Sequence, residues 1–329
     1  MQPETILGHG NIAIPTASNR HCFESVHRPR AFGMVGLVLG LVLFSASSAL
    51  AQRSNKDDDE MGPRPIKLRT KDRIELNGVY VPSEKEKEAI TVVIVHEWEG
   101  QMSPYLELVL GLSRAGYAVV AFDYRGHGGS AKYVDARGQL KEFDVSRMGR
   151  RDVENIVNVD METIKKFLKE ENNEGNLNLN TLVVLGIGEG SVFASNWALK
   201  DWMFPSVGKI KQSEDVKALV MISPNKQFKG MSIDNAIRNT KISNMPMMVV
   251  CGAESSDARD TNRMIKRIEG ERRKAGGGQV YGFQPLVYPS NLTDSALVTR
   301  APQLVEQIVS FINENVDVNK EINPWIERP

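Results

Sequence analysis

The sequence has 329 residues, of which 41% are hydrophobic, and this length suits one large domain or two small ones. Lys and Arg together number 41, as do Asp and Glu, so the formal net charge at pH 7 is zero. A nucleic-acid-binding surface needs an excess of basic residues on one face, which this balance does not suggest. The composition therefore argues against a nucleic-acid partner and is typical of a globular protein.

The first 51 residues have the pattern of an export signal. Residues 31–44 are apolar and uncharged, with three arginines before them and small residues after them, up to Ala51. This arrangement predicts a signal peptide that is cleaved after Ala51. The alternative is an uncleaved anchor, because residues 31–51 are just long enough to span a bilayer. Either way, the chain from Gln52 onward is predicted to be exported, as a periplasmic, secreted or membrane-anchored protein.

Beyond the signal, the chain divides into a linker, one domain and a tail. Residues 52–65 are charged and contain proline and glycine, which predicts a solvated linker. The domain is expected at residues 66–318 and a C-terminal tail at 319–329. The exported part has one cysteine, Cys251, so we expect no internal disulfide and a small buried side chain at that position.

Within the domain, strand patterns alternate with helix patterns. The run at 90–96 is almost continuously apolar, as in a parallel strand that is covered on both faces. In chain order, strands are predicted at 66–76, 78–81, 90–96, 118–123, 181–185, 216–223, 247–252 and 284–288. Helices are predicted at 103–115, 152–170, 191–199, 260–274 and 302–315. This alternation predicts an α/β domain with a mostly parallel, twisted central sheet of about eight strands and helices on both faces.

The most informative motif begins at Thr181 and has the sequence TLVVLGIGEGS. A buried strand, a glycine-rich turn and a helix are the setting of the G-x-S-x-G nucleophile elbow. Gly186 and Gly190 stand at the two outer glycine positions, and Gly188 stands where the nucleophile is expected. The motif is therefore an elbow without a nucleophilic side chain.

The same glycines also resemble a dinucleotide-binding loop. That motif needs a third glycine where Ser191 stands, and an acidic residue at the end of the next strand. Residues 200–208 do not have the pattern of such a strand. Glycines that simply permit a tight turn are the simpler interpretation, so no cofactor is expected, and a nucleotide-binding module is kept as a third hypothesis.

Two longer segments resemble α/β hydrolases. The segment VIVHEWEG, at 93–100, resembles the H-G-x-x-G segment that offers an oxyanion N–H, in the form seen in dienelactone-hydrolase-like and serine-esterase-like members. Residues 108–130 resemble the family's first helix, fourth strand and R-G-x-G-x-S loop. With the elbow, the resemblance covers nearly all of residues 66–318, and it implies an α/β-hydrolase fold.

The resemblance also implies a triad of Ser, Asp or Glu, and His in that chain order. This sequence departs from it at all three positions. Gly188 takes the nucleophile position, Ser255 stands where the acid is expected, with Asp257 nearby, and no histidine follows the elbow. The two histidines of the exported part, His96 and His127, belong to segments where the family's residues are usually structural. Without an imidazole base, a serine or cysteine is not activated in the usual way.

Two other kinds of catalytic group are present in the sequence, a serine near the elbow and several carboxylates. Ser191 lies three residues beyond the nucleophile position and is interpreted as a residue of the helix start. Several carboxylates are expected at the carboxyl edge of the sheet, where they could serve in acid–base chemistry or hold a cation. No spacing specifies either role, and no metal site is assigned. These carboxylates belong to Glu97, Glu99, Glu189, Glu254 and Asp257.

The sequence thus predicts an exported pseudo-hydrolase that binds an unidentified small molecule or partner protein. Its pocket is expected over the elbow, in the room left by the missing serine side chain, and backbone N–H groups there are expected to suit an anionic or carbonyl group. The alternative is an active hydrolase of esters or peptides with a non-standard catalytic set. The residues expected around the pocket are His96, Glu97, Trp98, Gly100 and Glu189.

Overall fold

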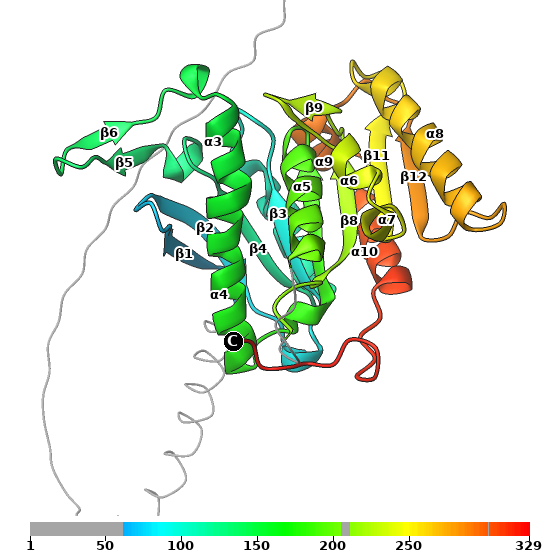
Figure 1. The fold of residues 1–329 in the computed structure, drawn as a ribbon, viewed down its shortest axis with the longest axis horizontal. Helices are drawn as coiled ribbons and strands as arrows, with labels where there is room; N and C mark the ends of the chain where they lie inside the picture. The colour runs from blue at the N-terminus through cyan, green and yellow to red at the C-terminus, as the bar shows by residue number, and fades with distance from the viewer. Residues whose placement is uncertain (1–61, 205–210, 302) are drawn as a thin grey trace, which may run out of the picture. The chain divides into compact units, whose positions relative to one another are not determined.

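The computed structural model describes residues 62–204, 211–301 and 303–329 (Figure 1). The predicted signal peptide and all but the last residues of the predicted linker lie outside this part of the chain. No helix within the described residues is long and apolar enough to cross a membrane.

The domain is built on an eight-stranded sheet with strand order β1-β2-β4-β3-β7-β8-β11-β12. β1 and β2 are antiparallel to their neighbours and the remaining pairs are parallel, so the predicted mostly parallel sheet of about eight strands is confirmed. The strands are β1 (Arg64–Arg69), β2 (Glu75–Val81), β3 (Thr91–Val95), β4 (Ala118–Asp123), β7 (Leu182–Ile187), β8 (Val216–Ile222), β11 (Met247–Gly252) and β12 (Phe283–Tyr288).

Helices cover both faces of the sheet (Figure 1). Alternate residues of β3 explain why: Val93 and Val95 join one buried cluster with α4, α5 and α8, whereas Val92 and Ile94 join the other with α2, α9 and α10. The helices are α2 (Leu106–Arg114), α3 (Arg150–Asn155), α4 (Met161–Glu174), α5 (Gly190–Met203), α6 (Asp234–Ile237), α7 (Thr240–Ser243), α8 (Ala258–Ala275), α9 (Asp294–Arg300) and α10 (Leu304–Asn315), with a π-helical turn at Ile156–Asp160 between α3 and α4. Two small hairpins complete the fold, β5 (Lys132–Val134) with β6 (Leu140–Glu142) and β9 (Gln227–Phe228) with β10 (Met231–Ser232).

The turn between the first two strands lies earlier than the sequence predicted. The Asn-Gly pair at 77–78 suggested a turn there, but the chain turns at residues 70–74, where the Thr70 hydroxyl accepts the N–H of Ile74 at 2.9 Å. Asn77 lies inside β2, and its amide donates to the carbonyl of Gly129 at 2.7 Å. The asparagine therefore anchors a loop instead of forming a turn.

Each edge strand of the sheet contains a proline, Pro65 in β1 and Pro285 in β12. Proline has no N–H to offer to an added strand and is confined to edge strands in sheets. Both prolines therefore protect the open edges against pairing with another chain.

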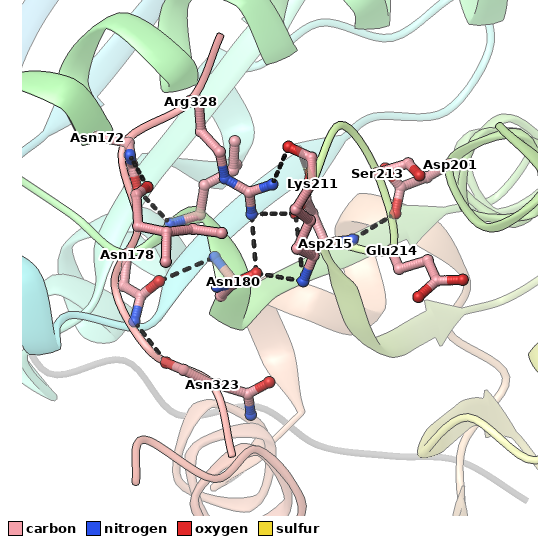
Figure 2. Close-up of polar contacts among 12 residues, drawn as sticks. Asn172, Asn178, Asn180, Asp201, Lys211, Ser213, Glu214, Asp215, Asn323 and Arg328 are labelled. Carbon is pink, nitrogen blue, oxygen red and sulfur yellow. Dashed lines mark hydrogen bonds and ion pairs between the residues drawn. The ribbon is translucent and has the colours of Figure 1, made fainter. Parts of the chain in front are cut away.

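The predicted C-terminal tail packs against the domain and joins a buried polar network (Figure 2). The fully buried guanidinium of Arg328 forms an ion pair with the carboxylate of Asp215 and donates to the amide oxygen of Asn180 at 2.8 Å. Asn173 binds the backbone of Arg328 on both sides, with each hydrogen bond 2.8 Å long. Asn178 donates to the carbonyl of Asn323 at 3.0 Å. The asparagine-rich segment formed by the end of α4 and the residues after it is thus the docking surface of the tail.

Candidate functional site

The glycine turn lies between β7 and α5, as the elbow motif predicted. Gly188 has a positive φ of 54°, which glycine adopts without strain. Its N–H donates to the carbonyl of Ile222 at 2.9 Å, and its own carbonyl accepts the N–H of Ser191 at 3.1 Å. The turn is therefore held on both sides, by β8 and by the first turn of α5.

The two outer glycines let α5 pack directly on the sheet. A Cβ atom at Gly186 would lie 2.5 Å from the Cα of Ser191. A Cβ atom at Gly190 would overlap the carbonyl oxygens of Val95 and His96, at the end of β3. Both positions require glycine because the obstacle is backbone, which has no rotamer with which to move away.

Two carboxylate side chains fill the space in front of Gly188. A Cβ atom built there would lie 2.7 Å from Oδ1 of Asp294 and 2.9 Å from Cβ of Glu97. The sequence predicted an unfilled space in front of Gly188, and that prediction was wrong. The space that a nucleophilic side chain would need is taken by Asp294 and Glu97.

Asp294 was not among the residues that the sequence analysis selected. It begins α9, after β12, with a positive φ of 47°, and its N–H donates to the hydroxyl of Ser223 at 3.0 Å. Burial, followed by the charges of Glu189 and Glu97, raises the pKa of Asp294 to about 7. It lies in the segment after β12, where the family resemblance places the histidine of the triad, and it is the one acidic residue between β12 and Arg300.

Glu97 and Glu189 are held by short polar contacts. The hydroxyl of Tyr105 donates to the carboxylate of Glu97, and burial raises the pKa of Glu97. The carboxylate of Glu189 accepts the backbone N–H of Trp98 at 3.0 Å and the side-chain amide of Asn225 at 2.5 Å. The N–H of Trp98, in the segment that resembles an oxyanion donor, is therefore already bound.

Gly100 and Trp98 support this arrangement. Gly100 donates its N–H to the carbonyl of Glu97 at 3.2 Å, and a Cβ atom there would lie 2.6 Å from the Glu97 carboxyl carbon. Trp98 packs edge-on against His127, with ring centroids 4.5 Å apart, and the ammonium of Lys229 lies 4.3 Å from the centre of its ring. Trp98 is thus half-buried in an aromatic cluster, beneath a lysine.

Both described histidines lie in the core. His96 contacts the carbonyl of Glu97 through Nδ1 at 2.7 Å, and its Nε2 lies 3.7 Å from Oδ1 of Asp123. Burial lowers the pKa of His96 to about 3. His127 contacts the carbonyl of Arg125 through Nδ1 at 3.0 Å, and burial lowers its pKa as well. Both imidazoles are therefore neutral at physiological pH and fixed by the backbone.

The remaining candidates differ in their surroundings. Ser191 donates its hydroxyl to the carbonyl of Gly186 at 2.9 Å, and Ser255 donates its own to the carbonyl of Gly252 at 2.7 Å. The carboxylate oxygens of Asp257 are buried without a hydrogen-bond partner among the described residues, and its charge contributes to the raised pKa of Asp294. The two serines therefore stabilise turns, whereas Asp257 adds to the negative charge around Asp294.

The structure thus brings together Glu97, Glu189, Asp257 and Asp294, with Trp98 and Gly100 beside them. Over the part of the chain that the structure describes, no group of three or more His, Cys, Asp or Glu residues has an arrangement that could hold a metal ion. What the arrangement offers chemically is a set of carboxyl groups beside a glycine turn, and two of them, Glu97 and Asp294, have a raised pKa.

The raised pKa of Asp294 predicts a pH-dependent stability. A carboxyl group whose pKa is higher in the folded than in the unfolded chain stabilises the fold fully below about pH 4, and this contribution is lost as the pH rises to about 7. Asp294→Asn cannot titrate, so we expect the variant to gain about 1–2 kcal/mol relative to the wild type between pH 4 and pH 8, because partial exposure screens the full effect.

Urea denaturation of both proteins at several pH values measures this difference, since all other titrating groups are common to the two proteins. Stability curves that stay parallel from pH 4 to pH 8 would contradict the assignment.

Comparisons with known proteins agree with the fold. The family model described as serine aminopeptidase, S33, matches residues 86–275, more than half of the chain. No curated protein matches the sequence significantly.

Among solved structures, an esterase from Pyrococcus furiosus superposes with a TM-score of 0.55 at 15% identity, covering 90% of this chain and 100% of its own. A carboxyl esterase from Bacillus coagulans has a TM-score of 0.52 at 13% identity, covering 78% of this chain and 100% of its own. A fungal esterase from Rhizomucor miehei has a TM-score of 0.51 at 12% identity, covering 84% and 92%. At these identities the structures support the fold alone. With the strand order and the elbow, the family match shows that this chain belongs to the serine aminopeptidase S33 family of α/β hydrolases.

Proposed function

We propose that this chain is a non-catalytic member of its family, a pseudo-hydrolase that acts by binding a small molecule or a partner protein beside the elbow. The observation that carries the proposal is the filling of the space at Gly188 by Asp294 and Glu97. A side chain at this position would have to displace the carboxylate of Asp294 and would press against Cβ of Glu97. As folded, the site therefore has no room for a nucleophilic side chain at Gly188.

The proposal is supported by the groups that acyl transfer needs and that this site lacks. The reaction needs an attacking group, a base that activates it and hydrogen-bond donors for the oxyanion. Gly188 has no attacking group, and both described imidazoles are fixed by backbone carbonyls. The N–H of Trp98 is bound by the carboxylate of Glu189. The carboxylate of Glu189 therefore occupies the N–H that an oxyanion would need as its hydrogen-bond donor.

The same carboxylates restrict what can bind. The sequence analysis expected free N–H groups that suit an anionic or carbonyl ligand, but Glu189 occupies the N–H of Trp98, and Glu97 and Asp294 stand beside it. Carboxylates repel an anion and attract a cation at close range. A neutral or positively charged group on the ligand or partner therefore fits this surface better than an anionic one.

One observation favours a second candidate, an active hydrolase with a non-standard catalytic set. Asp294 has a pKa of about 7, which is suitable for a general base. Nearby, the hydroxyl of Tyr105 donates a hydrogen bond to the carboxylate of Glu97. If such an activity exists, its rate should follow the ionisation of Asp294 with a midpoint near pH 7, and Asp294→Asn should abolish it.

The two candidates are separated by hydrolysis of a short-chain and a medium-chain p-nitrophenyl ester by purified residues 52–329, between pH 5 and pH 9. For the pseudo-hydrolase we expect rates equal to those of heat-denatured protein at every pH, in the wild type and in Asp294→Asn. Turnover that the Asn variant loses would establish the second candidate instead.

We also propose that the chain is exported, on the basis of the basic, apolar and small-residue pattern of residues 1–51. Expression of the full sequence in a bacterial host, followed by intact-mass measurement of the extracytoplasmic fraction, tests this. A product that begins at Gln52 is expected. A full-length product that stays in the cytoplasm would rule export out.

A further inference from the structure

A cavity of about 330 Å³ lies between the first turns of α4 and the last turns of α5, at some distance from the elbow. α5 begins beside Gly188, and Lys200 and Asp201 come more than ten residues along it, which at 1.5 Å per residue corresponds to about 15 Å. The volume of the cavity lies at the small end of the range for small-molecule sites. The charged side chains of its lining are Glu162, Lys165, Lys166, Lys169, Lys200 and Asp201.

The lining has more positive than negative charge. Lys165 is neutralised by two buried carboxylates, Asp201 and Asp215, and Lys200 pairs with Glu162 at 3.2 Å. Pro329 also lines the cavity. Among the side chains of the lining, four lysines face two acidic groups, and Asp215 and Glu170 pair with two of these lysines from outside the lining.

Lys169 is the lysine without a carboxylate partner. In the described chain it forms no ion pair, whereas Lys166 reaches Glu170 at 3.6 Å on the exposed side of α4. The side chain of Lys169 is half-buried, and its pKa is lowered by burial first and then by the positive charge of Lys165. Its ammonium thus lies in a half-buried position with no carboxylate at ion-pair distance among the described residues, and the negative charges of Asp215 and Glu162 act on it only from farther away.

More positive charge lies in the buried network of Figure 2, which is connected to the cavity lining through Lys165, the lysine that pairs with both Asp201 and Asp215. The guanidinium of Arg328 and the ammonium of Lys211 both approach the single carboxylate of Asp215. The pKa of Lys211 is lowered to about 8, by burial and by the charge of Lys217. Asp215 is thus shared among three cations, the ammonium groups of Lys165 and Lys211 and the guanidinium of Arg328.

We propose that this cavity binds a small molecule through a phosphate or similar oxyanion group, with Lys169 as the principal charge partner. Lysine is a compact, mobile point charge that suits a phosphate oxygen, and an anion at Lys169 would bring a negative group into direct contact with its ammonium. The site is separate from the elbow and does not depend on the proposed loss of catalysis. It gives this fold a binding function at the end of α5 that lies away from the elbow.

Differential scanning fluorimetry and calorimetric titration of residues 52–329 test the site at constant ionic strength. The probes are inorganic phosphate, glucose 6-phosphate and citrate, with glucose and sodium chloride as neutral and ionic controls. We expect phosphate-bearing probes to raise the Tm beyond sodium chloride. Citrate rather than phosphate as the stronger ligand would identify a carboxylate site and overturn the choice of phosphate.

Substitutions at Lys169 test whether the anion binds in this cavity. Lys169→Ala should weaken binding about ten-fold, the effect of losing one charge-assisted hydrogen bond, and Lys169→Arg should retain most of it. The matched control is Lys71→Ala, an exposed lysine in the turn between β1 and β2. No stabilisation by any probe beyond sodium chloride, or equal affinity in the Lys169→Ala and Lys71→Ala proteins, would overturn the proposal.

A measurement on the unmodified protein gives an independent check. An amine-acylating reagent at pH 8 should modify both Lys169 and Lys71, and saturating phosphate should slow the reaction at Lys169 alone. Equal protection of both lysines would indicate non-specific screening and contradict a defined site.

Discussion

Replacing Gly190 with alanine is expected to lower the free energy of unfolding by about 3 kcal/mol or more. The added methyl group would overlap the carbonyl oxygens of Val95 and His96, so α5 would have to move away from β3. Because the core on this face is closely packed, such a shift disturbs Val192 and Phe193, which are fully buried in the same helix. Chemical denaturation of Gly190→Ala beside the wild type measures the loss.

Gly270→Ala is the matched control. Gly270 lies inside α8, with no atom within 4 Å of an added Cβ. Alanine is the better helix former, so this variant should be as stable as the wild type or more stable, by up to about 1 kcal/mol. Equal stabilities for Gly190→Ala and Gly270→Ala would show that α5 does not approach β3 as described.

Removing the guanidinium of Arg328 is expected to cost about 3 kcal/mol, because the buried carboxylate of Asp215 would keep only its two lysine partners. Arg328 and Asp215 are both fully buried, and Arg328 also holds the amide oxygen of Asn180. The Arg328→Ala protein should therefore lose the tail contacts and unfold at a clearly lower denaturant concentration.

The control is Arg263→Ala, which removes an exposed ion pair with Asp260 on α8. Such a pair contributes at most about 1 kcal/mol. If Arg328→Ala cost no more than Arg263→Ala, the tail would not be an integral part of the domain. Limited proteolysis within residues 319–329 should show the same contrast, with cleavage faster in Arg328→Ala.

Much of the fold follows from local sequence patterns. The continuous apolar run of β3 specified a strand buried on both faces, and the spacing of Gly186, Gly188 and Gly190 specified the turn between β7 and α5. These predictions succeeded because burial on two faces and a backbone turn each leave a direct mark on nearby residues. The turn of the first hairpin failed because Asn77 makes a contact with Gly129 that is distant in sequence.

The candidate site was harder to predict for the same reason. Glu97 and Glu189 lie in motifs that could be recognised, but Asp294 reaches Gly188 from the far end of the sheet, through α9, which the sequence analysis did not predict. The role of Arg328 depends on asparagines more than 140 residues earlier in the chain. No periodicity or motif encodes such contacts, because they arise only when the chain has folded.

The central claim, that the elbow has no working nucleophile, is tested most directly by covalent labelling. Purified residues 52–329 would be incubated with a fluorophosphonate beside an active serine esterase of the same fold, and the intact masses measured. We expect the esterase to gain one phosphonyl group and this protein to keep its original mass. A single stoichiometric adduct, mapped to Ser191 or to any other residue at the elbow and lost on prior heat denaturation, would contradict the account and identify the nucleophile.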